Sequence, residues 1–410
     1  MKGIFKKYWE NLISKIIFIK IMAESRRVPF SRIILSVGIT YLISVLRKCK
    51  ISTEPLKIAY ARHKQKLIRA PKILANLETL RVCITYSCNK ECSFCYSRSF
   101  QEEFKHHMVL SDFDFLLNWA KLQGWKAIRF LGGEPTVHPE FKSILSMTEK
   151  KGFYIDLSTN GLFNSEISLF LGDKVVRSIN FSYPQDENNR DEKKLFHQNL
   201  KNAMDKETEL IMSCVIYPDK EDWRQVIDLA SKYRPNIVVR FSMVLPNNEK
   251  CSSFERVREN FKKMSRQALD IANYALKNHV TFHFYRPFLR CMLSDADFDY
   301  LDSISPFVYY TRCPLNLGDN YAGLRLTVNP DLSCYPCPVV RTGGVKIGPK
   351  VNLSDIEHRF KHVVSTMSAQ PLMDSCKTCD FFAKYQRQIK QKSFDLADKT
   401  VCQGGCFGYR

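Results

Sequence analysis

The sequence lacks a hydrophobic run long enough to cross a membrane. Its apolar patch from Ile33 to Leu46 covers about fourteen residues and is interrupted by small and polar side chains, whereas a membrane-spanning helix needs about 20 apolar residues. Internal repeats, low-complexity tracts and a cleavable signal peptide are also missing. These absences argue against an integral membrane protein, a repeat protein and a secreted protein. We therefore expect a cytoplasmic location.

Negative charge is scarce in this chain. Lys and Arg number 62 against 42 Asp and Glu, which gives a formal net charge of +20. Residues 1–72 account for +14 of this excess, so the remaining 338 residues carry only +6. Cationic segments can bind phosphates, but no nucleic-acid recognition fold is visible. Nucleic acid is therefore not an expected partner.

The first residues predict a basic amphipathic helix within an N-terminal extension over residues 1–75. Apolar residues recur in pairs four positions apart, with lysines on the opposite face. Such a helix can lie in a membrane interface or dock on a protein, and both roles remain open. The apolar positions are Ile4, Phe5, Tyr8, Trp9, Leu12, Ile13, Ile16 and Ile17.

The chain has fifteen cysteines, yet a disulfide framework is not expected. The count is odd, the cysteines are spread through 410 residues, and the cytosol keeps thiols reduced, so metal binding or catalysis is the favoured use. Cys49, Cys83, Cys214 and Cys251 have no motif around them. We expect these four thiols to pack as small hydrophobic groups.

Three cysteines share one short segment. Cys88, Cys92 and Cys95 have the spacing C-x3-C-x2-C, and Phe94 directly precedes the last of them. Iron–sulfur clusters select thiolate ligands, and three thiolates can hold three irons of a cubane while the fourth iron stays open to a small molecule. A structural zinc site would be closed by a fourth ligand, and no nearby residue is placed to supply one. The pattern favours a reactive cluster over zinc.

This spacing follows a strand-like segment over residues 80–85 and resembles the signature of radical S-adenosylmethionine (SAM) enzymes. In that family the amino and carboxyl groups of SAM chelate the open iron, and the resemblance places Phe94 against the adenine. A second predicted strand over residues 127–131 is followed by a turn similar to the family motif that receives the amino group. Its residues are Gly132, Gly133, Glu134 and Pro135. Glycines let a bare backbone approach a ligand, and a carboxylate accepts from an amine.

Polar side chains end three further predicted strands. The segment 154–161 offers Ser158 and Asn160, which the resemblance directs toward the ribose and the substrate. Ser182 lies in the segment 178–183, where relatives often have an aspartate two positions later, but this chain has Pro184 and Gln185. Arg240, in the segment 236–241, is either a partner for the carboxylate of SAM or part of a rim salt bridge.

Strands alternate with helical segments over residues 76–290, which is the pattern of a parallel sheet built from βα units. We therefore predict an α/β fold, a partial (β/α)6 barrel of the TIM type. Parallel barrels place their sites at the C-terminal ends of the strands, where all these motifs fall.

Residues 291–410 resemble the SPASM or twitch extension, which binds one or two auxiliary iron–sulfur clusters. A hairpin with an Asn-Pro-Asp turn is predicted over 326–337, followed by a helix over 353–360. We expect at least one auxiliary cluster, with zinc or buried thiols as alternatives. The candidate ligands are Cys313, Cys334, Cys337, Cys376, Cys379, Cys402 and Cys406.

These seven cysteines fall short of the eight ligands of the full two-cluster extension. If Cys313, Cys334, Cys337 and Cys406 complete one cluster, the other three form a three-thiolate site, either open to substrate or closed by a ligand other than cysteine. Cys291, near the predicted end of the barrel, has two interpretations: a packing residue or a hydrogen donor to a radical.

The resemblance implies an enzyme that cleaves SAM reductively to a 5′-deoxyadenosyl radical, which then abstracts a hydrogen from the substrate. An electron donor such as flavodoxin or ferredoxin is the implied partner. A peptide or protein is the favoured substrate, and a lipid or small metabolite at the membrane surface is the alternative. A second alternative is a non-catalytic metal-binding or electron-transfer protein.

Overall fold

The structure is a computed structural model. It describes residues 79–171, 176–185, 190–204, 208–233, 237–244, 254–286, 288–304, 326–340, 342–372, 374–391 and 400–402. The predicted N-terminal extension, Cys313 and Cys406 lie outside these residues. No helix in the described part of the chain is both long and apolar enough to cross a membrane.

One sheet with the strand order β10-β9-β8-β1-β2-β3-β4-β5-β6-β7 organises the described residues. Neighbours from β1 to β7 are all parallel, which confirms the predicted open partial barrel. A short seventh strand extends the six that we expected. The strands are β1 (Thr79–Thr85), β2 (Ala127–Gly132), β3 (Tyr154–Thr159), β4 (Val176–Ser182), β5 (Glu209–Ile216), β6 (Ile237–Met243) and β7 (Thr281–Phe284).

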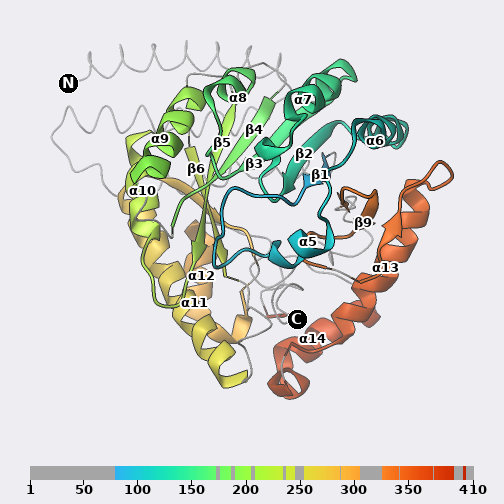
Figure 1. Cartoon of the computed structure of the whole chain (residues 1–410). Helices are drawn as coiled ribbons and strands as arrows, with labels where there is room; N and C mark the ends of the chain where they lie inside the picture. The colour runs from blue at the N-terminus through green and yellow to red at the C-terminus, as the bar shows by residue number, and fades with distance from the viewer. Residues whose placement is uncertain are drawn as a thin grey trace, which may run out of the picture.

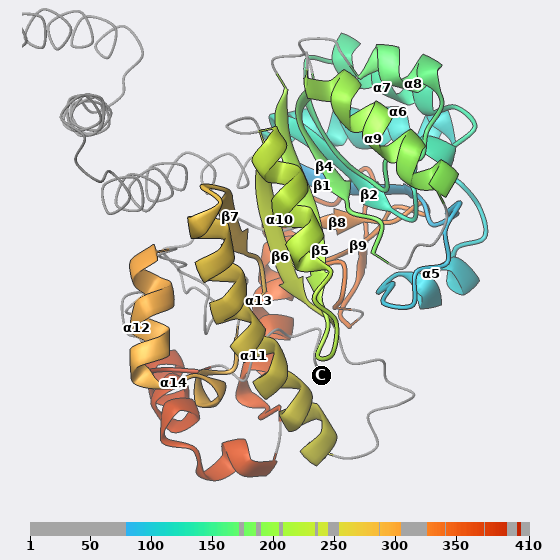
Figure 2. The same cartoon turned by 90° about the vertical axis from the view of Figure 1, so that its left-hand side faces the viewer.

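Helices follow these strands and cover the outer face of the curved sheet (Figure 1). Figure 2 shows α10 and α11 packed outside β5 and β6. The helices are α5 (Arg98–Glu103), α6 (Leu110–Leu122), α7 (Phe141–Lys150), α8 (Ser165–Phe170), α9 (Arg190–Met204), α10 (Trp223–Lys232), α11 (Phe254–Lys277) and α12 (Asp295–Ile304).

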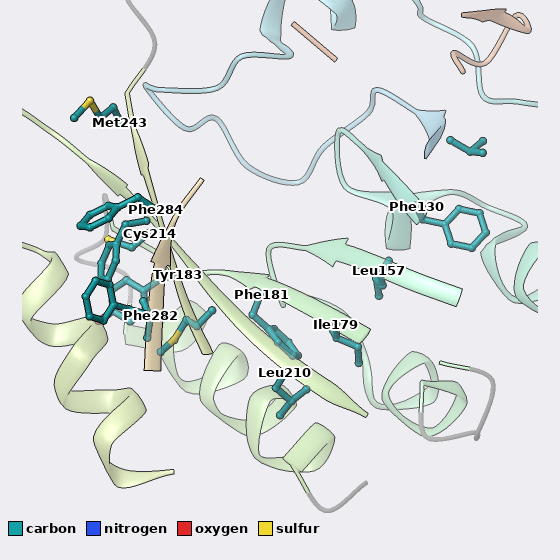
Figure 3. Packing of buried hydrophobic residues seen from close by; sticks show 14 of the residues in the cluster. Phe130, Leu157, Ile179, Phe181, Tyr183, Leu210, Cys214, Met243, Phe282 and Phe284 are labelled. Atoms are coloured by element: carbon teal, nitrogen blue, oxygen red, sulfur yellow. The ribbon is translucent and has the colours of Figure 1, made fainter. Parts of the chain in front are cut away.

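The strands alternate between two kinds of side chain, because successive residues of a strand point to opposite faces. Apolar residues such as Phe130, Leu157 and Phe181 join the main hydrophobic cluster between sheet and helices, as Figure 3 shows. The residues between them are polar on most strands and line a cavity on the inner face, for example Arg129 and Asn180. The alternation thus gives the barrel a polar interior within an apolar shell.

A buried carboxylate balances part of the positive charge inside the barrel. Asp156 on β3 is 1% exposed and pairs with Arg129 at 2.9 Å and with Arg177 at 2.7 Å. Burial raises the pKa of this carboxyl, but the two guanidinium groups outweigh burial and hold its pKa below the usual value. Asp156 is therefore a charged structural group.

The predicted C-terminal hairpin adds to the barrel sheet instead of forming a separate one. Strand β8 (Thr327–Val328) pairs parallel with β1, and β9 (Ser333–Tyr335) returns antiparallel to β8. Strand β10 (Val345–Lys346) completes this edge. Asp331 closes the turn by accepting hydrogen bonds from the backbone and hydroxyl of Ser333, at 2.9 and 2.6 Å. The hairpin is confirmed, while the division at residues 290 and 291 stays a prediction.

The predicted helix at 353–360 is confirmed as α13 (Leu353–Ala369), which lies beside β9 and α6 in Figure 1. Asn352 and Asp355 form a capping box at its first turn. Trp119 of α6 donates its indole N–H to the carbonyl of Val351 at 2.7 Å. A 3₁₀ helix η4 (Asp374–Thr378) and α14 (Asp380–Lys390) follow. The C-terminal segment is therefore fixed to the barrel through α6.

Candidate active site

A cavity of about 820 Å³ lies at the C-terminal ends of the parallel strands. It brings together almost every residue that the sequence assigned to the cluster and to SAM. Pro135 is the exception in that set, because it is buried at the start of the 3₁₀ helix η1 (Pro135–Val137) and does not line the cavity. The predicted residues that line it are Cys88, Cys92, Cys95, Phe94, Gly132, Gly133, Glu134, Ser158, Asn160, Ser182 and Arg240.

The cysteine loop is held by hydrogen bonds from neighbouring strand ends. Asn160, after β3, donates its side-chain amide to the side-chain oxygen Oδ1 of Asn89 at 2.6 Å, and the side-chain amide of Asn89 donates to the backbone oxygen of Leu162 at 3.1 Å. Lys90 forms a 2.9 Å ion pair with Glu192 at the first turn of α9. Asn160 was predicted as a substrate-facing residue, and the structure shows that it also positions the loop.

The Cys88 thiol is a poor anion without a metal. Burial raises the pKa of Cys88 to about 11, and the negative charges of Glu134, Cys95 and Cys92 act in the same direction. A thiolate needs nearby positive charge to form at neutral pH. Iron ions would supply that charge, so the three cysteines fit a cluster.

The two glycines of the Gly-Gly-Glu-Pro turn are required because the neighbouring backbone leaves no room for a Cβ atom. A Cβ atom on Gly133 would lie 2.3 Å from the carbonyl oxygen of Ser87, and one on Gly132 would lie 2.4 Å from that of Thr85. Gly133 also has its backbone N–H bonded to the Thr85 oxygen at 3.0 Å, and Glu134 bonds to the Ser87 oxygen at 2.9 Å. The bare backbone approaches the strand end that leads into Cys88, and its approach to a ligand stays a prediction.

Glu134 is a buried carboxylate with four hydrogen bonds. One oxygen accepts from Thr136, through its backbone at 3.2 Å and its hydroxyl at 2.7 Å, and from the Thr159 hydroxyl at 2.8 Å. The other accepts from the backbone N–H of Asn160 at 2.6 Å. Burial raises the pKa of Glu134 above its ordinary value even though these bonds oppose the shift. A cationic amine in the cavity would stabilise the charged form, which suits the predicted role.

Arg240 lies on the inner face of β6 within a polar network. Its Nε donates to the Ser213 hydroxyl at 2.9 Å, which in turn donates to Asn180 at 2.6 Å. Its guanidinium carbon lies 4.6 Å from the centre of the Tyr285 ring. Burial lowers the pKa of Arg240 to about 10, and the charges of Arg129, Arg286 and Arg81 add to this effect.

The predicted rim salt bridge of Arg240 is not formed within the described residues. No carboxylate there lies within 4 Å of Arg240 or of Arg286, which donates instead to the backbone oxygen of Met243. Both side chains line the cavity. An anionic ligand group would therefore find two guanidinium groups that have no carboxylate partner among the described residues. Sequence reasoning missed Arg286, because a lone arginine after a short strand carries no motif.

The departure from the family pattern after Ser182 has a structural role. Gln185 donates its amide to the backbone oxygen of Val215 at 2.7 Å and accepts from the backbone N–H of the same residue. This side chain thus continues the pairing of β4 with β5. Ser182 is exposed toward the cavity, and Ser158 is partly buried there.

The C-terminal cysteines fall into different places. Cys337 lines the cavity together with Cys95, although the sequence assigned it to an auxiliary cluster. Cys334 is fully buried in the main hydrophobic cluster. Cys376 and Cys402 are buried away from the cavity. No three Cys, His, Asp or Glu side chains in the described ranges surround the position of a single metal ion.

The sequence model of the radical SAM superfamily, a protein family, matches residues 82–259 of this chain. The chain is 32% identical over 96 residues to the S-adenosylmethionine-dependent nucleotide dehydratase of Selenomonas ruminantium, covering 23% of this chain and 31% of that protein. It is 34% identical over 104 residues to the tungsten-containing aldehyde ferredoxin oxidoreductase cofactor-modifying protein of Pyrococcus furiosus, covering 24% and 28%. The GTP 3′,8-cyclase of Campylobacter fetus is 31% identical over 111 residues, covering 26% and 34%. The chain thus spans about a third or less of these relatives.

Solved structures match a larger share of the chain. SuiB of Streptococcus suis bound to S-adenosylmethionine has a TM-score of 0.55 at 16% identity, covering 84% of this chain and 79% of SuiB. SuiB bound to its precursor peptide SuiA gives 0.54 at 16%, covering 84% and 77%. The protein anSMEcpe with bound AdoMet and the Kp18Cys peptide gives 0.54 at 17%, covering 80% and 88%. At these identities the likeness shows the fold.

Proposed function

We propose that this chain, whose residues 82–259 are a radical SAM domain, cleaves SAM reductively and abstracts a hydrogen atom from a peptide. The [4Fe–4S] cluster that this chemistry needs would be bound by Cys88, Cys92 and Cys95. The observation that carries the proposal is that these thiols, Glu134 and Arg240 line one cavity.

The residues of the cavity divide the work of binding SAM. Glu134 would accept hydrogen bonds from the amino group, and Arg240 would donate to the carboxylate. Phe94 would lie against the adenine, with Ser158 and Asn160 near the ribose. When bound, the cluster and SAM supply the 5′-deoxyadenosyl radical, while the protein orients the reactants and excludes water.

A peptide substrate is supported by the fold and by the size of the cavity. SuiB and anSMEcpe, which share the fold over at least 80% of this chain, have been solved with bound peptides. A cavity of about 820 Å³ lies within the range of small-molecule sites, roughly 300 to 1,000 Å³. It would hold SAM and one peptide side chain, while the rest of the peptide would lie outside.

A small anionic metabolite is the second candidate. Arg240 and Arg286 both line the cavity, and no carboxylate of the described residues lies within 4 Å of either. If Arg240 binds the carboxylate of SAM, Arg286 can bind a phosphate or carboxylate of the substrate. The names of two relatives refer to nucleotides, which agrees with such a substrate. The predicted membrane role of the N-terminal helix and a flavodoxin or ferredoxin donor remain predictions.

The enzyme proposal is tested by anaerobic reconstitution with iron and sulfide. Reduced protein with SAM should form 5′-deoxyadenosine and methionine, and Cys92→Ala should abolish both. Cys214→Ala is the matched control, because this thiol is buried in the hydrophobic cluster. If intact cluster absorbance comes with no SAM cleavage, the chain is a metal-binding or electron-transfer protein.

The two substrate classes are separated by adding either synthetic peptides or nucleoside triphosphates to the reduced enzyme. The true class should increase the rate of 5′-deoxyadenosine formation. An anionic metabolite should also lose its effect in Arg286→Met, whereas the exposed Arg224→Met should retain it. A response to peptides alone, unchanged in Arg286→Met, would remove the second candidate.

A further inference from the structure

Four cysteines lie outside the cavity on neighbouring parts of the fold, although they come from three separate segments of the chain. One is in the 3₁₀ helix η2 (Arg290–Met292), one is in η4, one directly follows η4, and the last follows α14. None of them lines the cavity. The four are Cys291, Cys376, Cys379 and Cys402.

Backbone and ring contacts fix three of these segments against one another. Cys402 donates its backbone N–H to the oxygen of Phe381 at 3.1 Å, which places it beside the first turn of α14. The backbone N–H of Arg290 lies 3.5 Å from the Cys402 sulfur and donates to it. The Arg290 guanidinium carbon lies 5.1 Å from the centre of the Phe381 ring. Cys291, the next residue, is therefore held beside Cys402 and the start of α14.

The pair Cys376 and Cys379 occupies the turn that starts α14. Cys379 is the N-cap residue of this helix and donates its backbone N–H to the Cys376 oxygen at 3.2 Å. The N-terminus of a helix carries partial positive charge, which favours a thiolate. Backbone N–H groups that donate to a sulfur, as Arg290 does, are a recurring feature of iron–sulfur sites.

We propose that Cys291 is the fourth ligand of an auxiliary iron–sulfur cluster whose other ligands are Cys376, Cys379 and Cys402. The sequence left those three thiolates either open to substrate or closed by a ligand other than cysteine. Cys291, which precedes the other three ligands in the sequence, supplies the fourth thiolate. It takes the place of a ligand that would follow them in the sequence. Because the site lies outside the cavity, its cluster would not contact a group bound inside the cavity. The proposal concerns metal content and does not depend on SAM cleavage.

The first test measures metal in a background without the loop cluster, the triple variant Cys88→Ala, Cys92→Ala and Cys95→Ala. In that background Cys291→Ala should lose about four irons per chain, or convert the cluster to a three-iron form visible by electron paramagnetic resonance. Cys214→Ala should change neither iron nor sulfide. Unchanged iron, sulfide and spectrum in Cys291→Ala would overturn the proposal.

The second test needs no variant and uses the exposure of Cys291. Iodoacetamide should alkylate this thiol in the iron-free protein and at least tenfold more slowly in the reconstituted protein, as read by peptide mass spectrometry. The buried Cys214 should react slowly in both samples. Equal alkylation of Cys291 in the two samples would overturn the proposal. Protection by zinc, without iron and sulfide, would overturn the assignment to a cluster.

Discussion

The molecule has two groups of cysteines that we propose as metal ligands, and each group is assembled in a different way. Cys88, Cys92 and Cys95 lie within eight residues of sequence and line the cavity. The second group joins Cys291 to thiols at least 85 positions away and lies outside the cavity. The first group depends on local spacing and the second on tertiary packing. Three thiolates of the loop group are enough for a cluster whose fourth iron stays open. The second group needs Cys291 as a fourth thiolate for its cluster to be closed.

The supports of the two groups differ as well. The loop is attached to the ends of β1, β2 and β3 through Gly133, Glu134 and Asn160. The second group is attached to η2 and to the first turn of α14. We therefore expect a change at one site to leave the metal content of the other intact.

Removal of one cysteine ligand from each site should give the largest difference in SAM cleavage between the two sites. Cys92→Ala should reduce 5′-deoxyadenosine formation to background, because the reaction begins at that cluster. Cys376→Ala should reduce SAM cleavage by no more than about tenfold to a hundredfold, the usual cost of changing a residue near a metal site that is not its ligand, because Cys376 does not line the cavity. The measurement is SAM cleavage together with iron and sulfide content. Equal loss of cleavage in both variants would contradict the independence of the sites.

Removing the charge of Glu134 should weaken SAM binding by about tenfold to a hundredfold, the value of a hydrogen bond to a charged group. Glu134→Gln is nearly isosteric, and isothermal titration with SAM measures the change. The metal content of the second site should stay the same. Unaltered SAM affinity would place the amino group elsewhere in the cavity.

The raised pKa of Glu134 also predicts a pH dependence. The folded protein binds this proton more tightly than the unfolded chain, so the stability it contributes is present below pH 4.5 and lost as pH rises through the raised pKa. Without SAM, the stability of the wild type relative to Glu134→Gln should therefore fall over that window. Urea unfolding at several pH values checks this, and parallel curves for the two proteins would contradict it.

Gly133→Ala tests how closely the loop is attached to the sheet. The new Cβ would lie 2.3 Å from the Ser87 oxygen, and such overpacking costs about 1–3 kcal/mol. Gly348→Ala is the control, because no atom lies within 4 Å of its added Cβ. Denaturant unfolding gives both values. A change below about 0.5 kcal/mol in Gly133→Ala would show that the backbone can shift without loss.

Lys90→Ala should have the smallest effect. Its ion pair with Glu192 is partly exposed, and such pairs contribute at most about 1 kcal/mol. A double-mutant cycle with Glu192→Ala in low and high salt measures the coupling. A larger, salt-independent coupling would mean that this pair, and not the backbone contacts of Gly133, holds the loop in place.

The sequence predicted what depends on local spacing and periodicity. The strand ending at Thr85, the glycine turn at 132–133 and the hairpin around Asp331 each carry their own pattern, and the structure contains all three. Cys83 and Cys214 are buried, as predicted. Motif spacing thus predicted the part of the cavity lining that we assign to the cluster and SAM.

The features that were missed arise from packing between distant segments. Arg286 enters the cavity because β7 ends there, and the backbone of Arg290 bonds to Cys402 because η2 packs against Phe381. The side chain of Gln185 forms both backbone hydrogen bonds of Val215 that a neighbouring strand would otherwise form. None of these contacts leaves a trace in spacing or composition, because each depends on where two separate elements meet.

The pairing of β8 with β1 has a consequence for synthesis on the ribosome. Arg81 and Val82 pair with Thr327 and Val328, so one edge of the first strand gains its partner only when most of the chain has been translated. Until then that edge exposes unsatisfied backbone groups, which invite pairing with other chains. Non-local pairing of this kind also slows folding. The nascent barrel is thus expected to depend on chaperones until its last hairpin emerges.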